Sequence, residues 1–248
     1  MIVPGLVSVT FRQLTTDEVV DVAVANGLRA IEWGGDVHVP VGDTTTAGAV
    51  ATRCAAAGVA VAAYGSYYRA GVSGDFAPVL DTALALSAPR IRVWAGDSGS
   101  ASTPADQRAA VVGDLRRVTE LAAERGVEIA VEYHARTLTD TLSSTVDLFA
   151  AVGHQGMRPY WQPPIGESDA SCLATVAALL PDLVTTHVFS WADDGARMPL
   201  SARESLWRQV FARVRREPGE RYALLEFVRD DDPAALAEDA ATLHALLG

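Results

Sequence analysis

Short apolar runs alternate with alanine- and leucine-rich stretches of helical periodicity along the whole chain. Each apolar run is rich in β-branched or aromatic residues and ends in a turn, a pattern that predicts strands followed by helices. The predicted strands are Leu6–Phe11, Ala30–Trp33, Val59–Tyr64, Arg90–Trp94, Glu128–Tyr133, Arg158–Gln162, Val184–Phe189 and Tyr222–Val228. Helices are expected near residues 16–26, 46–57, 76–87, 104–125, 143–152, 168–180, 201–216 and 233–247.

Residues at the predicted helix ends support these assignments. Thr15, with Glu18 three residues later, forms the pattern of a capping box at a helix start. Pro104 and Pro233 follow a threonine and an aspartate, where first-turn prolines belong. Glycines at 27, 58 and 126 come directly after predicted helices, where a left-handed cap favours glycine.

The repeat of strand and helix predicts one domain over residues 1–248, a single (β/α)8 TIM barrel in the α/β class. The length of 248 residues is ordinary for this fold. An open doubly wound sheet is disfavoured because no G-x-G-x-x-G sequence follows the first strand. In a barrel, the loops that follow the strands gather on the face where catalysis takes place.

Four polar side chains end successive predicted strands in the second half of the chain, namely Glu132, Gln162, His187 and Glu226. Each follows an apolar run, and a buried polar group is costly unless it has a partner. Because adjacent strands lie about 4.8 Å apart, neighbouring strand ends can meet at one point. Two carboxylates, an amide oxygen and an imidazole nitrogen are suitable ligands for one divalent cation. We therefore expect these four residues to bind a metal ion.

Composition limits the classes of binding partner that we expect for the protein. The net charge of −11 argues against nucleic-acid binding, which needs clustered lysine and arginine. No run of about 20 apolar residues is present, so no membrane span is expected. The N-terminus lacks the features of a signal peptide, and a cytoplasmic protein is expected. The apolar helix faces are compatible with a homo-oligomer.

Several motifs resemble those of the xylose isomerase-like TIM barrels, a family that includes sugar isomerases and epimerases. The motifs are S-V-T-F at 8–11, G-L-R-A-I-E-W at 27–33, V-E-Y-H at 131–134, T-H-V-F-S-W at 186–191 and L-L-E-F at 224–227. The resemblance implies a divalent ion held by Glu132, His187 and Glu226. Mn²⁺ is the expected metal, with Mg²⁺, Co²⁺ or Zn²⁺ as alternatives. Gln162 departs from the family aspartate, and Ile165 replaces a histidine three residues later, which should weaken metal binding.

The resemblance also implies a reaction on a small sugar or polyol. In an isomerase or epimerase, Glu132 and Glu226 would remove and return a proton next to a carbonyl, through an enediolate. The same first step could lead to loss of a leaving group, as in a dehydratase or a lyase. A third hypothesis is a barrel that binds sugar without turning it over, because Gln162 removes one acidic ligand.

Further residues are candidates for substrate binding. Arg197 is placed by the resemblance in a substrate-contacting loop, but it could instead pair with Asp193 or Asp194. His134 could bind substrate or orient Glu132, and Glu32 could bind a hydroxyl or hold a loop. His38 could reach the site from the loop after the second strand. Aromatic rings near the strand ends could stack on a sugar or simply fill the barrel mouth: Trp33, Trp94, Trp161, Trp191 and Tyr68.

Overall fold

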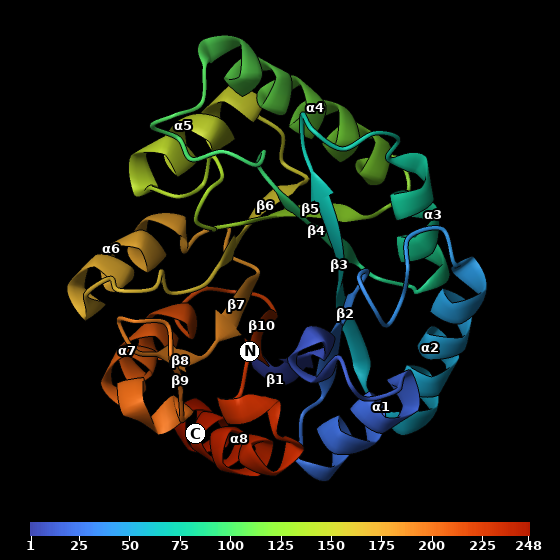
Figure 1. Cartoon of the computed structure of the whole chain (residues 1–248), viewed down its shortest axis with the longest axis vertical. Coiled ribbons are helices and arrows are strands. Elements are labelled where there is room, and N and C mark those ends of the chain that lie inside the picture. Colours follow the sequence, from blue (N-terminus) through green and yellow to red (C-terminus); the bar gives the residue numbers. More distant parts are fainter.

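A computed structural model describes all residues, 1–248, and shows a closed barrel of eight parallel strands inside a ring of helices (Figure 1). The barrel strands are β1 Ile2–Val7, β2 Ala30–Gly34, β3 Ala60–Arg69, β4 Arg90–Trp94, β5 Glu128–Glu132, β6 Met157–Trp161, β7 Thr185–Val188 and β10 Arg221–Leu225. The helices are α1 Thr16–Ala25, α2 Thr44–Ala57, α3 Ala77–Ala85, α4 Ala105–Ala123, α5 Leu142–Val152, α6 Asp169–Leu179, α7 Glu204–Val214 and α8 Pro233–Leu247. Pairing of β1 with β10, in the register Ile2 to Arg221, closes the barrel. The predicted (β/α)8 TIM barrel is confirmed.

The helix-end predictions hold at most positions. Thr15 and Glu18 form both hydrogen bonds of the capping box at the start of α1. Pro233 occupies the first turn of α8 after the capping residue Asp232. Gly58 ends α2 with φ of 68°, in the left-handed region. Pro104 lies one position earlier than expected, at the cap of α4 rather than inside its first turn.

The predicted first strand, Leu6–Phe11, is wrong in its second half. The strand begins at Ile2 and ends at Val7, and residues Ser8–Phe11 form a 3-10 helix, η1. The change of direction is stabilised by the Ser8 hydroxyl, which accepts a hydrogen bond from the Gly34 amide at 2.9 Å. The sequence of η1, Ser-Val-Thr-Phe, alternates polar and apolar residues as a strand does, and all four are buried, so the sequence pattern did not mark the strand end.

Apolar side chains form two separate cores. A large cluster of 56 buried residues fills the space between the barrel and the helices. A smaller cluster of 10 buried residues, including Val7, Ala130 and Leu224, lies on the opposite side of the strands and fills the inside of the barrel. Because successive side chains of a strand point to opposite faces, strand position decides which core a residue joins.

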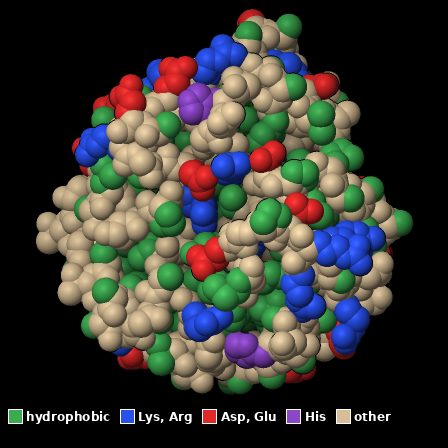
Figure 2. Space-filling model, turned by 180° about the vertical axis from the view of Figure 1, so that it is seen from behind, with side chains coloured by type: hydrophobic (Ala, Val, Ile, Leu, Met, Phe, Trp, Pro, Cys, Tyr) green, Lys and Arg blue, Asp and Glu red, His purple; other side chains and the backbone are tan.

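The segment after β7 contains structure that the sequence pattern did not predict. Ser190–Trp191 and Arg197–Met198 pair as a short antiparallel hairpin, β8 and β9. A 3-10 helix, η2 (Leu200–Arg203), then leads into α7, and a third 3-10 helix, η3 (Arg229–Asp231), lies between β10 and α8. Figure 2 shows acidic and basic side chains interspersed on one face of the molecule, with hydrophobic side chains between them. None of the helices has the length and apolar character required to cross a membrane.

Candidate active site and metal centre

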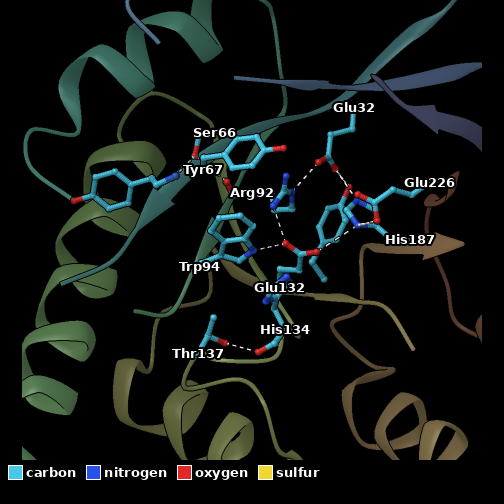
Figure 3. Close-up of polar contacts among 12 residues, drawn as sticks. Glu32, Ser66, Tyr67, Arg92, Trp94, Glu132, His134, Thr137, His187 and Glu226 are labelled. Atoms are coloured by element: carbon cyan, nitrogen blue, oxygen red, sulfur yellow. Dashed lines mark hydrogen bonds and ion pairs between the residues drawn. The ribbon is translucent and has the colours of Figure 1, made fainter. Parts of the chain in front are cut away.

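Three of the four strand-end residues meet at one end of the barrel. Glu132 is the last residue of β5, His187 lies in β7, and Glu226 directly follows β10. The Nδ1 atom of His187 lies 3.2 Å from Glu226 Oε2 and 3.4 Å from Glu132 Oε1. All three side chains are buried and point toward one another, as Figure 3 shows. The convergence predicted from the sequence is therefore present for these three residues.

A buried arginine, Arg92, forms hydrogen bonds with two carboxylates. The Nε atom of Arg92, in β4, donates to Glu32 Oε1 at 2.7 Å, and its Nη1 donates to Glu132 Oε2 at 2.7 Å (Figure 3). The Glu132 Oε2 atom also accepts a hydrogen bond from the Trp94 indole N–H. Burial alone would raise the pKa of Glu132, but the charge of Arg92 lowers it well below its usual range. Glu132 is thus a fixed, ionised carboxylate.

Glu32 contacts the other nitrogen of the His187 imidazole. Its Oε2 lies 3.1 Å from His187 Nε2 and also accepts a hydrogen bond from the Tyr160 hydroxyl. Despite complete burial, the charges of Arg92 and His187 lower the pKa of Glu32 to about 2. A carboxylate on one imidazole nitrogen fixes the ring and leaves the other nitrogen for a metal, which is the usual second partner of a metal-binding histidine.

Charge and bonding in this cluster suit a divalent cation. Three buried carboxylates, on Glu32, Glu132 and Glu226, face the single fixed positive charge of Arg92, which leaves an excess of two negative charges. His187 Nδ1 and Glu226 Oε2 are both buried without a hydrogen-bond partner. Burial would lower the pKa of His187, but Glu226 and Glu32 raise it well above its usual value.

The side chains are not arranged in the geometry of a ready-made metal site. The raised pKa of His187 favours its protonated form in the absence of a metal, and that charge would offset one of the two excess negative charges. The oxygen and nitrogen donors of Glu132, His187 and Glu226 nevertheless fit a divalent metal, because their unpartnered atoms face one another.

Gln162 belongs to a cavity that adjoins the cluster rather than to the cluster itself. The cavity has a volume of about 390 Å³. Its lining residues come from the ends of β5, β6, β7 and β10 and the loops after them: Tyr133, His134, Ala135, Arg136, Asp140, Gln162, Pro163, Pro164, Ile165, Phe189, Trp191 and Phe227. Gln162 directly follows β6 and is half-buried in this wall. Its coordination of a metal stays a prediction.

Four other predicted residues lie at the rim of the barrel mouth. His134 and Trp191 line the cavity, and His134 lies 5.2 Å from the Trp94 ring, centroid to centroid. Arg197 forms an ion pair with Asp231, not with the expected Asp193 or Asp194, and its guanidinium lies 4.8 Å from the Phe227 ring. Their contact with a substrate stays a prediction.

The structure contradicts the assignment of five residues to substrate contact. Trp33 and Trp161 are fully buried and face the helices, where the Trp161 indole donates to Thr175 of α6. The Tyr68 hydroxyl donates to Asp114 of α4, away from the mouth. The remaining two residues, His38 and Glu32, contact polar groups in the protein interior. His38 contacts the Ser8 hydroxyl and the Leu14 carbonyl, and Glu32 is enclosed by its three partners and does not hold a loop.

Sequence reasoning missed Arg92 and Tyr160, whose side chains complete the buried network. Arg92 lies two positions before Trp94, and Tyr160 lies two positions before Gln162, so each points to the same side of its strand as the residue at the strand end. Strand periodicity could have found both, because a charged or hydroxylated residue at an inward position needs a partner. It also missed Phe189 and Phe227, which form the apolar part of the cavity wall.

Comparison with known proteins agrees with this architecture. The model of the xylose isomerase-like TIM barrel family matches residues 20–164, which is more than half of the chain. The chain belongs to this family. The resemblance found in the strand motifs is thereby confirmed.

One curated relative shows similarity over part of the chain. A 3-dehydroshikimate dehydratase of Bacillus anthracis is 38% identical over 69 residues, which are 28% of this chain and 25% of that protein. The matched stretch thus spans about a quarter of that relative.

Solved structures resemble the chain over its whole length. A probable 3-DHS dehydratase involved in petrobactin synthesis from Bacillus anthracis superposes with a TM-score of 0.83 at 21% identity, over 98% of this chain and 99% of that one. A D-psicose 3-epimerase from Clostridium cellulolyticum H10 gives a TM-score of 0.70 at 14% identity, over 98% and 99%. At these identities the likeness establishes the fold alone.

Proposed function

We propose that the protein is a divalent-metal-dependent dehydratase that removes water from a small cyclic hydroxy-ketone of the 3-dehydroshikimate type. The observation that carries the proposal is the unequal state of the two carboxylates that flank His187. Glu132 Oε2 accepts hydrogen bonds from the Arg92 guanidinium and the Trp94 indole. Glu226 has no such donor: its Oε2 lies 3.2 Å from His187 Nδ1 without forming a hydrogen bond, and Glu132 Oε1 shares that nitrogen at 3.4 Å.

This difference favours elimination over epimerisation. Epimerisation needs one group to remove a proton and a second to return a proton to the opposite face of the carbon. Glu132 is poorly suited to that second role, because Arg92 holds its pKa low and a strongly ionised carboxylate binds protons weakly. Elimination needs one base, Glu226, and one acid for the departing hydroxyl group.

Two residues carry out the proton transfers of this reaction. Glu226 takes the proton from the carbon next to the carbonyl, and the electron pair moves toward the neighbouring carbon as its hydroxyl group leaves. His134, on the cavity wall, gives a proton to that hydroxyl group so that it departs as water. Solvent then restores both residues to their starting protonation states, so that the net change is the loss of one water molecule.

A bound divalent ion, held by Glu132, His187 and Glu226 with Gln162 as a fourth candidate ligand, would supply positive charge that stabilises the developing enolate oxygen. Phe189, Trp191 and Phe227 enclose the ring and reduce the access of water. The similarity to a 3-dehydroshikimate dehydratase over 69 residues supports this choice of substrate class.

Isomerisation or epimerisation of a sugar is the second candidate, favoured by the fold shared with the D-psicose 3-epimerase. One experiment separates the two. Protein loaded with Mn²⁺ is incubated in D₂O with 3-dehydroshikimate and, separately, with a panel of ketoses, and the products are analysed by mass spectrometry and ultraviolet absorbance.

The proposal predicts that 3-dehydroshikimate loses water and yields a product with aromatic absorbance. A ketose that gains deuterium without losing mass as water, while 3-dehydroshikimate is returned unchanged, would establish the epimerase instead. A metal-loaded protein that binds these compounds and changes none of them would support the non-catalytic hypothesis.

A further inference from the structure

Arg136 is a cation on the wall of the mouth cavity whose side chain has no partner in the protein. It lies in the loop after β5, four residues beyond Glu132, and its side chain is exposed. Its backbone φ is 59°, in the left-handed region that residues other than glycine seldom occupy. Backbone strain of this kind is often kept at functional sites, where it positions a side chain.

The other arginines around the mouth are already engaged. Arg12 bonds to Asp36 and to the Tyr67 hydroxyl, and Arg197 pairs with Asp231. Arg69 stacks on the Trp94 ring at 4.2 Å and donates to the Gly96 carbonyl. Arg92, as described, is buried between two glutamates. Arg136 is therefore the arginine of the cavity wall that is free to bind an anion.

Two other residues of the same cavity wall, Asp140 and Trp191, each have one polar atom without a hydrogen bond. The Oδ1 atom of Asp140 is buried without a hydrogen bond, while its Oδ2 accepts from the Ser100 amide. The Trp191 indole nitrogen is likewise buried without an acceptor. The cavity thus offers a cation, a hydroxyl acceptor and an N–H donor around an apolar wall, which matches a ring that carries a carboxylate and hydroxyl groups.

We infer that Arg136 binds the carboxylate of the substrate and makes the site selective for a ring acid over a neutral sugar. This inference rests on the proposed function, because it assigns a substrate group within the same cavity. Arginine is suited to this role, since its planar guanidinium can donate two parallel hydrogen bonds to one carboxylate.

The test uses unreactive probes, so that binding is measured without turnover. 3-Hydroxybenzoate and 3-hydroxybenzamide have the same ring and differ in one negative charge. Each is titrated calorimetrically into the Mn²⁺-loaded wild-type protein and into the variants Arg136→Met, Arg136→Lys and Arg69→Met. Arg125→Met is the matched control, because Arg125 is exposed in the turn that precedes β5, at the opposite end of the barrel.

The wild type is expected to bind the acid about tenfold or more tightly than the amide, as a charge-assisted pair would provide. Arg136→Met should bring that ratio close to one, Arg136→Lys should keep part of it, and Arg125→Met should leave it unchanged. With a reacting acid substrate, Arg136→Met should raise KM far more than it lowers kcat.

The inference is overturned if the wild type shows no measurable binding of the acid, or no preference for it over the amide. It is also overturned if Arg136→Met keeps the wild-type ratio, or if Arg69→Met is the variant that loses it. These results are separate from the test of the dehydratase, because a preference for the acid can persist in a protein that removes no water. Equally, dehydration can persist without a role for Arg136.

Discussion

Arg92 Nη1 donates to Glu132 Oε2 at 2.7 Å inside the barrel, where both side chains are almost completely shielded from water. The same guanidinium holds Glu32 through Nε at 2.7 Å. A buried carboxylate without its counter-charge is costly, so this arginine stabilises the fold as well as ordering the site.

Replacing Arg92 by methionine should therefore lower the free energy of unfolding of the metal-free protein by about 3–5 kcal/mol, because it leaves buried charge uncompensated. Urea unfolding followed by circular dichroism measures the change. Arg158→Met is the control, since Arg158 pairs with Glu128 and Asp182 at a partly exposed site and should cost no more than about 1 kcal/mol. Equal losses in the two variants would show that the buried network does not stabilise the fold.

Glu226→Gln tests the assignment of the base. The amide cannot take a proton, and loss of a general base should lower kcat by about 10²–10⁴-fold. Its carbonyl oxygen remains available to a metal, but the lost charge should lower the affinity for Mn²⁺, so the two proteins are compared at Mn²⁺ concentrations that saturate both. Activity within a factor of a few of the wild type would exclude Glu226 as the base.

Gln162→Asp tests whether the residue after β6 binds the metal. If Gln162 is a ligand, the added negative charge should raise the affinity for Mn²⁺ by about tenfold, because charge strongly increases the strength of an oxygen ligand. Competition with a chelating dye measures the affinity. Gln209→Asp adds the same charge on the exposed face of α7 and should have little effect. If both variants bind Mn²⁺ equally well, Gln162 does not coordinate it.

We predict that Asp239, which lies outside the site, makes the stability of the fold depend on pH. Its Oδ1 accepts from the Leu200 amide at 2.7 Å and so holds η2, and burial raises the pKa of its carboxyl above the ordinary 3.8. A raised pKa in the folded state means that the stabilisation is present below the ordinary pKa and is lost as the pH rises through the folded value.

Asp239→Asn stays neutral and keeps an acceptor oxygen, so it should be more stable than the wild type at pH 7. The two proteins should converge near pH 3, as urea midpoints at the two values would reveal. A lower midpoint for the variant at pH 7 would mean that the ionised carboxylate stabilises the fold.

The sequence was sufficient for the barrel and for three residues of the site. Hydrophobic periodicity and helix caps predicted the succession of strands and helices, and polar residues after apolar runs led to Glu132, His187 and Glu226. The end of β1 was misplaced because η1 alternates polar and apolar residues as a strand does.

The orientation of individual side chains was harder to predict. Trp33 and Trp161 lie at strand ends, directly after Glu32 and Tyr160, whose side chains point into the barrel. Because successive side chains of a strand alternate between its two faces, both tryptophans point to the helices. Glu32 and Arg92 lie in different strands and 60 positions apart, so their ion pair depends on the closed barrel and leaves no local pattern. The hairpin of β8 and β9 has strands of two residues, too short for periodicity to reveal.

The metal centre is tested most directly by anomalous X-ray scattering at the manganese edge from crystals grown with Mn²⁺. We predict one strong peak per chain, within coordinating distance of His187 Nδ1 and of carboxylate oxygens from Glu132 and Glu226. A map with no peak there, or with Mn²⁺ bound only at surface carboxylates, would contradict the proposed metal centre.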